Sequence, residues 1–432
     1  MGKAKVNFSE KLQNVLGPFA SKINRNKYIL AIRDGMLAYM PFTFIASIFL
    51  IIAFFPIPAY IEFMTNTFGA GWQTRLAYVS HSSLNVGGLL VVIAVANKMA
   101  DSFEVNKIQS ILTAVVSFLL LTPQTPIEGE GTFLLLTRIS AQAIFLAIIV
   151  GIFIVLIYKK VTDKNLKIKM PSSVPPAVSA PFESIIPSLF VIVFFWIIRL
   201  ILELGFDTYA MSLINNVLGR PLIFLGGSLI GTIIVTMFEQ LLWFFGLHGA
   251  AIVNSVMEPI WQVMEDQNRM ASYAGDIPPN IIGMSFRLFS LIGVVGAVIA
   301  ILIVAKSRQY KEVGKIAGVP YIFNIGEPTL FGIPLMLNAI YFIPFTFTRV
   351  VSTIIAYVAF TIGIVPLPTG LAQVPWTTPP IISGFLVTGS INGAILQIVL
   401  LVITTLIWIP FVKIADKQIY EKEQQPETKA MS

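Results

Sequence analysis

The chain contains no cysteine and few charged residues. Of its 432 residues, 12% are charged and 56% are hydrophobic, whereas a soluble domain carries about 25% charged residues. The absence of cysteine excludes disulfides, thiolate catalysis and cysteine metal sites. The charges are too few to cover the surface of a soluble protein of this size, so apolar surface must face lipid. The composition therefore predicts an integral membrane protein.

Several motifs of energised or metal-dependent proteins are also missing. The sequence has no GxxxxGK[ST] P-loop, which excludes an ATP-driven pump within this chain. It has no HExxH motif, no metal-ligand cluster and no regular arginine ladder of a voltage sensor. We therefore expect no metal and no other cofactor. The excess of 29 Lys and Arg over 22 Asp and Glu bears on membrane topology rather than on nucleic acid.

Apolar runs near or above about 20 residues, the length that crosses a hydrocarbon core, recur along the chain. The first begins near Tyr28 after a long basic lead, so we expect an uncleaved first span rather than a signal peptide. The segment 335–366 is long enough to be broken in two, which gives eight to ten spans in all. The predicted spans are 28–58, 74–97, 108–123, 132–158, 184–206, 221–246, 283–305, 335–366 and 386–412.

Basic loops predict that the N- and C-termini are both cytoplasmic. The longest of these loops, between the fourth and fifth predicted spans, holds Lys159, Lys160, Lys164, Lys167 and Lys169. The count fails in the second half, because 247–282 would have to cross the membrane although it holds several charged residues. Either this segment is a re-entrant hairpin plus a broken helix, or the segment 306–315 is not cytoplasmic, and both alternatives stay open.

The regularity of the spans divides the chain into two predicted domains. Residues 1–206 show regular spans with short loops and are expected to form a scaffold. Residues 207–432 are interrupted by Gly, Pro and polar residues and are expected to form a transport domain. Irregular backbone at membrane depth is tolerated only when it is buried in protein or lines an aqueous cavity. The substrate site is therefore expected in the second domain.

The first interruption runs from Glu239 to Gly249 and brings a carboxylate, an indole and an imidazole into an apolar run. Polar groups buried in a bilayer are costly and usually functional, so Glu239, Trp243 and His248 are candidate ligands of the substrate. His248 lies between glycines 246 and 249, which predicts a helix end or turn where its ring can face a cavity. The alternative is a hydrogen-bonded histidine that stabilises this turn.

The second interruption, 319–334, holds three prolines and two glycines that forbid an uninterrupted helix. Asn324 and Glu327 lie within it. A carboxylate can accept two hydrogen bonds from vicinal hydroxyls, which is how proteins bind polyols, so Glu327 is a candidate sugar ligand. It can instead bind a proton or a cation, or simply lie at the N-terminus of a half-helix and be stabilised by the helix dipole.

The third interruption, 366–380, predicts non-helical backbone between two apolar runs, as in a second re-entrant loop. Trp376 in this segment can stack on the apolar face of a sugar ring or act as an interfacial aromatic anchor. Asn85 and Asn254 are weaker candidates for substrate contact, and Asn85 is alternatively a helix-packing residue. Arg287 can pair with Glu258 or with Glu239.

Three motifs together resemble a bacterial phosphotransferase-system sugar transporter: the stretch from Trp243 to Gly249, Asn324-Ile325-Gly326-Glu327-Pro328, and the loop 375–380. The chain is similar over essentially its whole length to enzyme IIC permeases of the lactose/cellobiose/diacetylchitobiose family. This resemblance implies an all-α homodimer of the bacterial inner membrane, with about ten transmembrane helices and two re-entrant hairpins. It also implies that the N-terminal half forms the dimer contact and that the C-terminal domain holds the sugar and moves as a rigid body.

The resemblance further implies uptake of a β-linked disaccharide, diacetylchitobiose or cellobiose, coupled to its phosphorylation. The phosphoryl group comes from phosphoenolpyruvate through a phosphocysteine on enzyme IIB, which must be a separate partner because this chain has no cysteine. Glu327 is implied to contact the hydroxyl that becomes phosphorylated, where it can orient the hydroxyl and take its proton. His248 is implied to hydrogen-bond the sugar.

Two other functions remain open from the residues alone. A proton- or cation-coupled secondary sugar transporter, with Glu327 or Glu239 as the ion site, needs the same buried carboxylate and broken helices. A membrane-embedded enzyme without transport is the third possibility. The phosphorylation state of the imported sugar, and dependence on phosphoenolpyruvate rather than on a proton gradient, would separate the first two.

Overall fold

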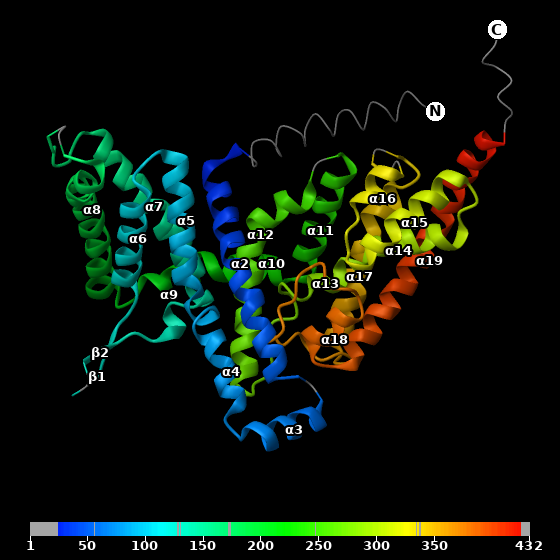
Figure 1. Cartoon of the computed structure of the whole chain (residues 1–432), viewed down its shortest axis with the longest axis horizontal. Helices are drawn as coiled ribbons and strands as arrows, with labels where there is room; N and C mark the ends of the chain where they lie inside the picture. The colour runs from blue at the N-terminus through cyan, green and yellow to red at the C-terminus, as the bar shows by residue number, and fades with distance from the viewer. Residues whose placement is uncertain are drawn as a thin grey trace, which may run out of the picture. The chain divides into compact units, whose positions relative to one another are not determined.

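The computed structural model describes residues 25–424 apart from eight positions within that range: Pro56, Glu128, Glu130, Ser172, Ser173, Leu247, Pro334 and Leu337. Five further side chains lie outside the description: Pro176, Ala177, Glu327, Pro328 and Phe331. Helices dominate the described residues, so the prediction of an all-α fold is confirmed. The strands found among them are a short antiparallel pair, β1 (Thr125–Ile127) and β2 (Gly131–Phe133) (Figure 1).

The described chain forms two compact units. The N-terminal unit comprises residues up to 224 together with 254–266, and the C-terminal unit comprises 225–253 and 267–424. The helices of the N-terminal unit are α2 (Lys27–Ala53), α3 (Pro58–Phe68), α4 (Trp72–His81), α5 (Gly87–Phe103), α6 (Lys107–Leu121), α7 (Ile144–Asp163), α8 (Pro176–Leu200), α9 (Ala210–Ile214) and most of α10 (Arg220–Gly227).

Small residues let the helices of the N-terminal unit approach one another closely. In this unit, α5 packs against α2, α6 and α7, and α6 packs against α8 (Figure 1). The Gly88 N–H donates to the Ser140 carbonyl over 3.1 Å, and a Cβ added at Gly88 would lie 2.7 Å from that oxygen. Gly151 also has no room for a side chain, because a Cβ added there would lie 2.9 Å from a Val95 methyl group. Close contact between backbones is how helices associate within lipid.

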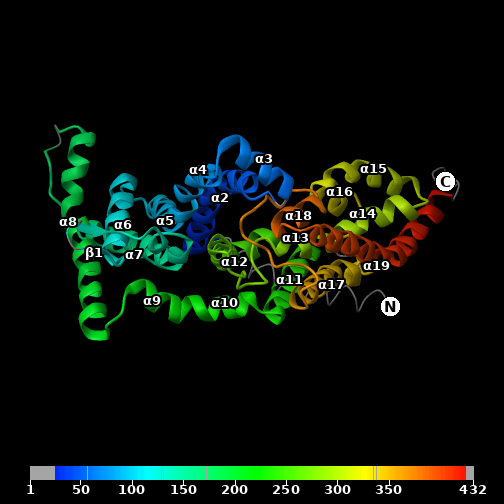
Figure 2. The same cartoon turned by 90° about the horizontal axis from the view of Figure 1, so that it is seen from below.

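The C-terminal unit is built from shorter and more interrupted helices. They are α11 (Leu229–Phe244), α13 (Arg287–Ser290), α14 (Ile292–Val304), α15 (Arg308–Ile322), α16 (Glu327–Gly332), α17 (Phe342–Thr361), α18 (Ile382–Thr388) and α19 (Ile391–Glu423). Figure 2 shows α14 beside α19, the most extensive pairing in this unit. The indole N–H of Trp408, which is fully buried, donates to the Gly293 carbonyl over 3.0 Å and ties these two helices together.

Seven helical segments among the described residues are long and apolar enough to cross a membrane. They are 27–53, 72–103, 136–163, 178–205, 287–304, 342–361 and 391–423, and the bent pair 210–227 and 229–244 can supply an eighth. Each corresponds to a predicted span, so the multi-pass architecture is confirmed. The predicted span 108–123 is represented by α6, which has only 15 residues. The segment 335–366 contains one continuous helix, α17, rather than two.

The segment that resisted a topology prediction contains a single long helix, α12 (Gly249–Ala274). Its 26 residues rise about 39 Å at 1.5 Å per residue, enough to cross a hydrocarbon core. The alternative of a re-entrant hairpin is therefore wrong for these residues. The charged side chains of Glu258, Glu265, Asp266 and Arg269 are all buried, and hydropathy cannot distinguish polar groups that protein covers from those that water covers.

Candidate functional site

A buried ionic cluster joins α11 to α17 and α13. The Glu239 carboxylate, only 2% exposed, accepts hydrogen bonds from Arg349 Nη1 at 2.8 Å and from Arg287 Nη2 at 3.3 Å. Arg349 Nη1 also donates to Gln240 Oε1 at 3.0 Å, and Gln240 Nε2 donates to the Phe345 carbonyl at 2.9 Å. The predicted pairing of Arg287 with Glu239 is confirmed. Both oxygens of Glu239 have cationic partners, so the cluster anchors the end of α11.

His248 lies at the N-cap of α12, which confirms the predicted helix end. Its Nδ1 accepts a hydrogen bond from the Ala251 N–H at 3.1 Å. An acceptor nitrogen carries no proton, so the neutral ring carries its hydrogen on Nε2. The imidazole is exposed and lies against Trp243, with ring centroids 4.4 Å apart and planes inclined by 44°. The ring therefore stabilises the turn through Nδ1 while Nε2–H remains a donor for a ligand.

Asn324 connects the second and third interruptions. It lies in the turn between α15 and α16 with a left-handed φ of 58°, which asparagine tolerates better than most residues. Its Nδ2 donates to the carbonyls of Trp376 at 2.8 Å and Thr378 at 3.0 Å. Its Oδ1 is buried and has no hydrogen-bond partner among the described residues. The segment 366–380 contains no helix, as predicted, and Trp376 is 50% exposed.

One hydrophobic core holds the first and second interruptions together. Phe244 and Phe245, at the end of α11, share this core with Leu330 and Ile333 of the α16 region. The first residue of α16 is Glu327, whose side chain lies outside the described residues. The backbone that carries Glu327 and the helix end that precedes His248 are thus packed on the same core.

The start of α15 is held by α19. The buried carboxylate of Asp416 accepts hydrogen bonds from the backbone N–H groups of Lys306 at 2.7 Å and Ser307 at 3.0 Å, and from the Ser307 hydroxyl at 2.6 Å. One turn further, the hydroxyls of Tyr310 and Tyr341 lie 2.9 Å apart. Burial raises the pKa of Tyr310, so this pair is neutral at physiological pH. The turn that carries Asn324 therefore extends from a helix with a fixed start.

Comparison with known proteins identifies the family. The family model described as "Phosphotransferase system, EIIC" matches residues 33–348. The chain belongs to the EIIC family. The cellobiose-specific EIIC component of Geobacillus stearothermophilus is 40% identical, over 98% of this chain and 97% of that protein. The crystal structure of ChbC, the IIC component from the N,N'-diacetylchitobiose-specific phosphotransferase system, is 38% identical with a TM-score of 0.90, covering 96% of this chain and 99% of that one.

Family membership confirms the expected class of function. This EIIC chain is the multi-pass, sugar-translocating component of a phosphotransferase system, with a sugar as substrate and an EIIB component as partner. The lactose-specific EIICB component of Streptococcus mutans, 30% identical over 94% of this chain and 72% of that protein, carries C and B components together. The comparisons support group translocation and give no support to a proton-coupled secondary transporter.

Two buried polar residues of the EIIC chain escaped the sequence analysis. Arg349 completes the ionic cluster with Glu239, and Gln397 makes hydrogen bonds that support the start of α18. Each stands alone in a long apolar run, and an ionisable or amide group inside such a run is itself a sign of a functional or structural site. Both residues could therefore have been identified from the sequence as isolated polar groups within apolar runs.

The other predicted ligands are not brought into these contacts. Asn85 lies in a 3-10 turn (Leu84–Val86), and both Asn85 and Asn254 belong to the N-terminal unit. Glu327 falls outside the described side chains, so its predicted role stays a prediction. In the described part of the EIIC chain, no group of three or more His, Asp or Glu residues could hold a metal ion.

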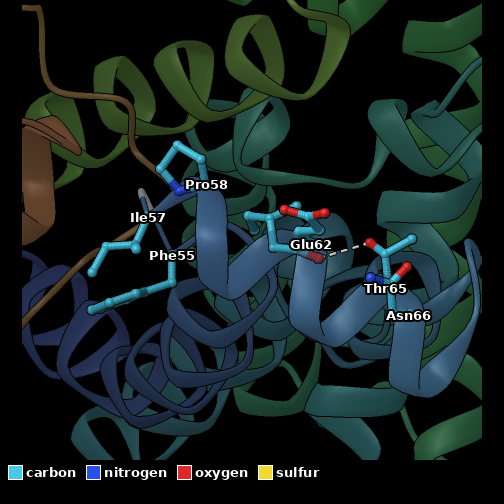
Figure 3. A pocket seen from close by; sticks show the side chains of 7 residues that line it. Phe55, Ile57, Pro58, Glu62, Thr65 and Asn66 are labelled. Atoms are coloured by element: carbon cyan, nitrogen blue, oxygen red, sulfur yellow. Dashed lines mark hydrogen bonds between the residues drawn. The ribbon is translucent and has the colours of Figure 1, made fainter.

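Two pockets among the described residues of the EIIC chain are lined by other residues than the predicted ligands. The pocket in the N-terminal unit is lined by Phe55, Ile57, Pro58, Ile61, Glu62, Thr65 and Asn66. Figure 3 shows Phe55 and Ile57 at one end of it and Thr65 and Asn66 at the other. A groove of about 500 Å³ in the C-terminal unit has walls from α14 and α15 and ends at Pro379 and Pro380. Neither pocket includes a predicted ligand.

Proposed function

We propose that the C-terminal unit of this EIIC chain binds a β-linked disaccharide, cellobiose or diacetylchitobiose, and presents one hydroxyl to phospho-EIIB. The names of the relatives support this substrate class, since one is a cellobiose-specific EIIC component and another serves N,N'-diacetylchitobiose. The observation that carries the proposal is the double hydrogen bond from Asn324 to the carbonyls of Trp376 and Thr378. These bonds connect the segments 319–334 and 366–380, which together form one wall of the proposed sugar site.

Each proposed ligand has a distinct task at this wall. Glu327 orients the acceptor hydroxyl and takes its proton while the phosphoryl group moves from the cysteine of EIIB to the sugar oxygen. His248 donates Nε2–H to a sugar oxygen, and the half-exposed ring of Trp376 offers an apolar face for a pyranose. Asn324 shapes this wall through its two Nδ2 hydrogen bonds. Its Oδ1 is buried and has no hydrogen-bond partner among the described residues, so it accepts from a sugar hydroxyl only once it is uncovered.

For the remaining predicted ligands we propose less direct tasks. Trp243 packs on the His248 ring and fixes its orientation. Glu239 acts through Arg349, because the salt bridge between them holds the end of α11 on which Trp243 lies. Asn85 and Asn254 stay proposed ligands on the N-terminal unit.

We also propose that the first domain is the scaffold of a homodimer with both termini in the cytoplasm. The outer surface of α8 supports the dimer, because its exposed side chains include Phe182, Leu189, Phe190 and Trp196. Lipid alone can cover such a surface, and a second copy can cover it equally well. The lysine-rich loop that begins at Lys159 supports the orientation.

The test is uptake of radiolabelled cellobiose and diacetylchitobiose into cells that carry this chain. Wild type is expected to accumulate sugar phosphate, and both Glu327→Gln and deletion of the cognate EIIB are expected to abolish that product. Glu312→Gln is the matched control, since Glu312 is exposed on α15 and pairs only at the surface with Lys315. Free sugar that accumulates without EIIB, and stops on addition of a protonophore, would contradict the proposal.

A further inference from the structure

Ile381 adopts a strained backbone conformation directly after the non-helical segment 366–380, the Trp376 loop. Its φ is 77° and its ψ is −54°, close to a γ-turn geometry that is rare for any L-residue. The other described non-glycine residues with positive φ are Glu104, Asn165, Asp207 and Asn324. Unlike these four residues, Ile381 is branched at Cβ, and this branching makes the conformation more costly. Surrounding contacts must hold it in place.

Gln397, a fully buried residue of α19, supplies those contacts. Its Oε1 accepts hydrogen bonds from the backbone N–H of Ile381 at 2.6 Å and of Gly384 at 2.8 Å. The Ser383 hydroxyl adds a third contact to the same oxygen at 3.2 Å. A Cβ on Gly384 would lie 2.7 Å from Gln397 Oε1, so glycine is required for this approach. One side-chain amide therefore satisfies the strained turn and the first turn of α18.

The Trp376 loop is consequently held at two points. Asn324 binds the carbonyls of Trp376 and Thr378 from one side, and Gln397 binds Ile381 from the other. Four residues, 377–380, lie between Trp376 and Ile381, and two of them are prolines with fixed φ. Ile381 is therefore connected to Trp376 by a short segment in which two φ angles are fixed.

We propose that Gln397 is a positioning residue for sugar binding: it holds Ile381 in its strained conformation and thereby sets the position of the Trp376 loop. The inference rests on the proposed role of Trp376 in the sugar site. Gln397 itself touches no substrate. A purely structural alternative is that Gln397 only fastens α18 to α19, in which case the strain at Ile381 has no consequence for the sugar.

The experiment compares variants of the full-length chain with its EIIB partner. Gln397→Met keeps the side-chain volume and removes the acceptor of the Ile381 and Gly384 N–H groups. It is expected to raise the KM for cellobiose uptake about tenfold, because Ile381 is then free to leave its strained conformation. The maximal rate should stay within about twofold. Adding Ile381→Gly should restore the KM, because glycine adopts positive φ without strain. Adding Ile382→Gly, the matched control, should not.

A KM of Gln397→Met equal to that of wild type would overturn the proposal, as would equal rescue by both glycine substitutions. If Gln397→Met does not fold, Gln397→Asn withdraws the same amide by one methylene group and is expected to give the same KM and the same rescue. Failure of the proposed function can be distinguished from failure of this inference. If the proposed function is wrong, Glu327→Gln will still form sugar phosphate, whichever residue is present at position 397.

Discussion

The two halves of the chain bury different kinds of polar side chain. Between residues 25 and 224, every buried polar residue that the structure describes is a serine or a threonine. From 229 onward the buried set also includes carboxylates, amides and two arginines, Arg269 and Arg349. A hydroxyl can donate to the carbonyl one turn earlier, as Ser47 does to Thr43 at 2.8 Å. The buried Arg349 instead takes its partner, Glu239, from a distant helix.

The two halves therefore differ in the sequence separation between buried polar groups and their hydrogen-bond partners. The partners Arg349 and Glu239 are 110 residues apart, and Asp416 and Ser307 are 109 apart. Helices with locally satisfied hydroxyls can form in lipid one by one, whereas helices with buried charges are stable only after their partners are in place. The second half, whose helices depend on one another to fold, also holds every candidate sugar ligand except Asn85.

The largest expected effect comes from breaking the buried ionic cluster. Of the two arginines described in the cluster, Arg349→Leu leaves the Glu239 carboxylate only Arg287, at 3.3 Å. Removal of one member of a buried pair costs about 3–5 kcal/mol. We expect a large fall in the melting temperature of the purified protein in detergent. The change should appear in calorimetry and in the loss of monodisperse protein on size exclusion.

The matched control is an ion pair in the first half. Lys159 Nζ lies 3.0 Å from Asp163 Oδ1 on α7, with both side chains a third or more exposed. Lys159→Leu is expected to cost about 1 kcal/mol or less, as exposed pairs do. Equal losses from the two substitutions would show that the halves do not differ in their dependence on buried charge.

Much of the fold follows from the sequence, because an apolar run of sufficient length permits only a helix in lipid. The predicted runs anticipated α2, α7, α14 and α19. They did not anticipate α12, because its polar residues are covered by protein, and hydropathy measures the side chain rather than its surroundings. The run 335–366 was long enough for two spans, yet its described residues before Phe342 are not helical, and α17 is the helix found there.

The candidate site was predictable as a set of residues and not as an arrangement. Glycine, proline and isolated polar groups marked His248, Asn324 and Trp376. That Asn324 binds the backbone of the Trp376 loop could not be predicted, since the contact joins positions 52 residues apart. The strain at Ile381 left no mark in the sequence either, because isoleucine there is held by an amide 16 residues away.

A smaller effect should separate ligand binding from stability at a helix N-cap. His248→Asn keeps a side chain that can cap α12, because asparagine is a favoured N-cap residue, and it removes Nε2–H. We expect an unchanged melting temperature and about a tenfold loss of cellobiose affinity, measured by equilibrium binding to the purified chain. In the first half, Asn106 caps α6 by accepting from the Gln109 N–H.

Asn106→Ala is therefore the matched control for His248→Asn, because it removes a helix cap at a residue that is not a proposed ligand. It should cost about 1 kcal/mol of stability and leave cellobiose affinity at the wild-type value. If Asn106→Ala weakened binding as much as His248→Asn, the cap at His248 would have no special relation to the sugar.

The smallest expected effect is at a buried hydroxyl of the first half. The Thr113 hydroxyl donates to the Gln109 carbonyl at 2.6 Å and lies 2.9 Å from the Ser188 hydroxyl, so it links α6 to α8. Thr113→Val should lower the free energy of unfolding by only about 0.6 kcal/mol, the average for polar contacts between membrane helices. The measurement is a double-mutant cycle with Ser188→Ala in mixed detergent and lipid. A coupling energy as large as the loss of stability from Arg349→Leu would mean that buried hydroxyls stabilise the first half as strongly as buried charges stabilise the second. The contrast between the halves would then lie in their backbone irregularity alone.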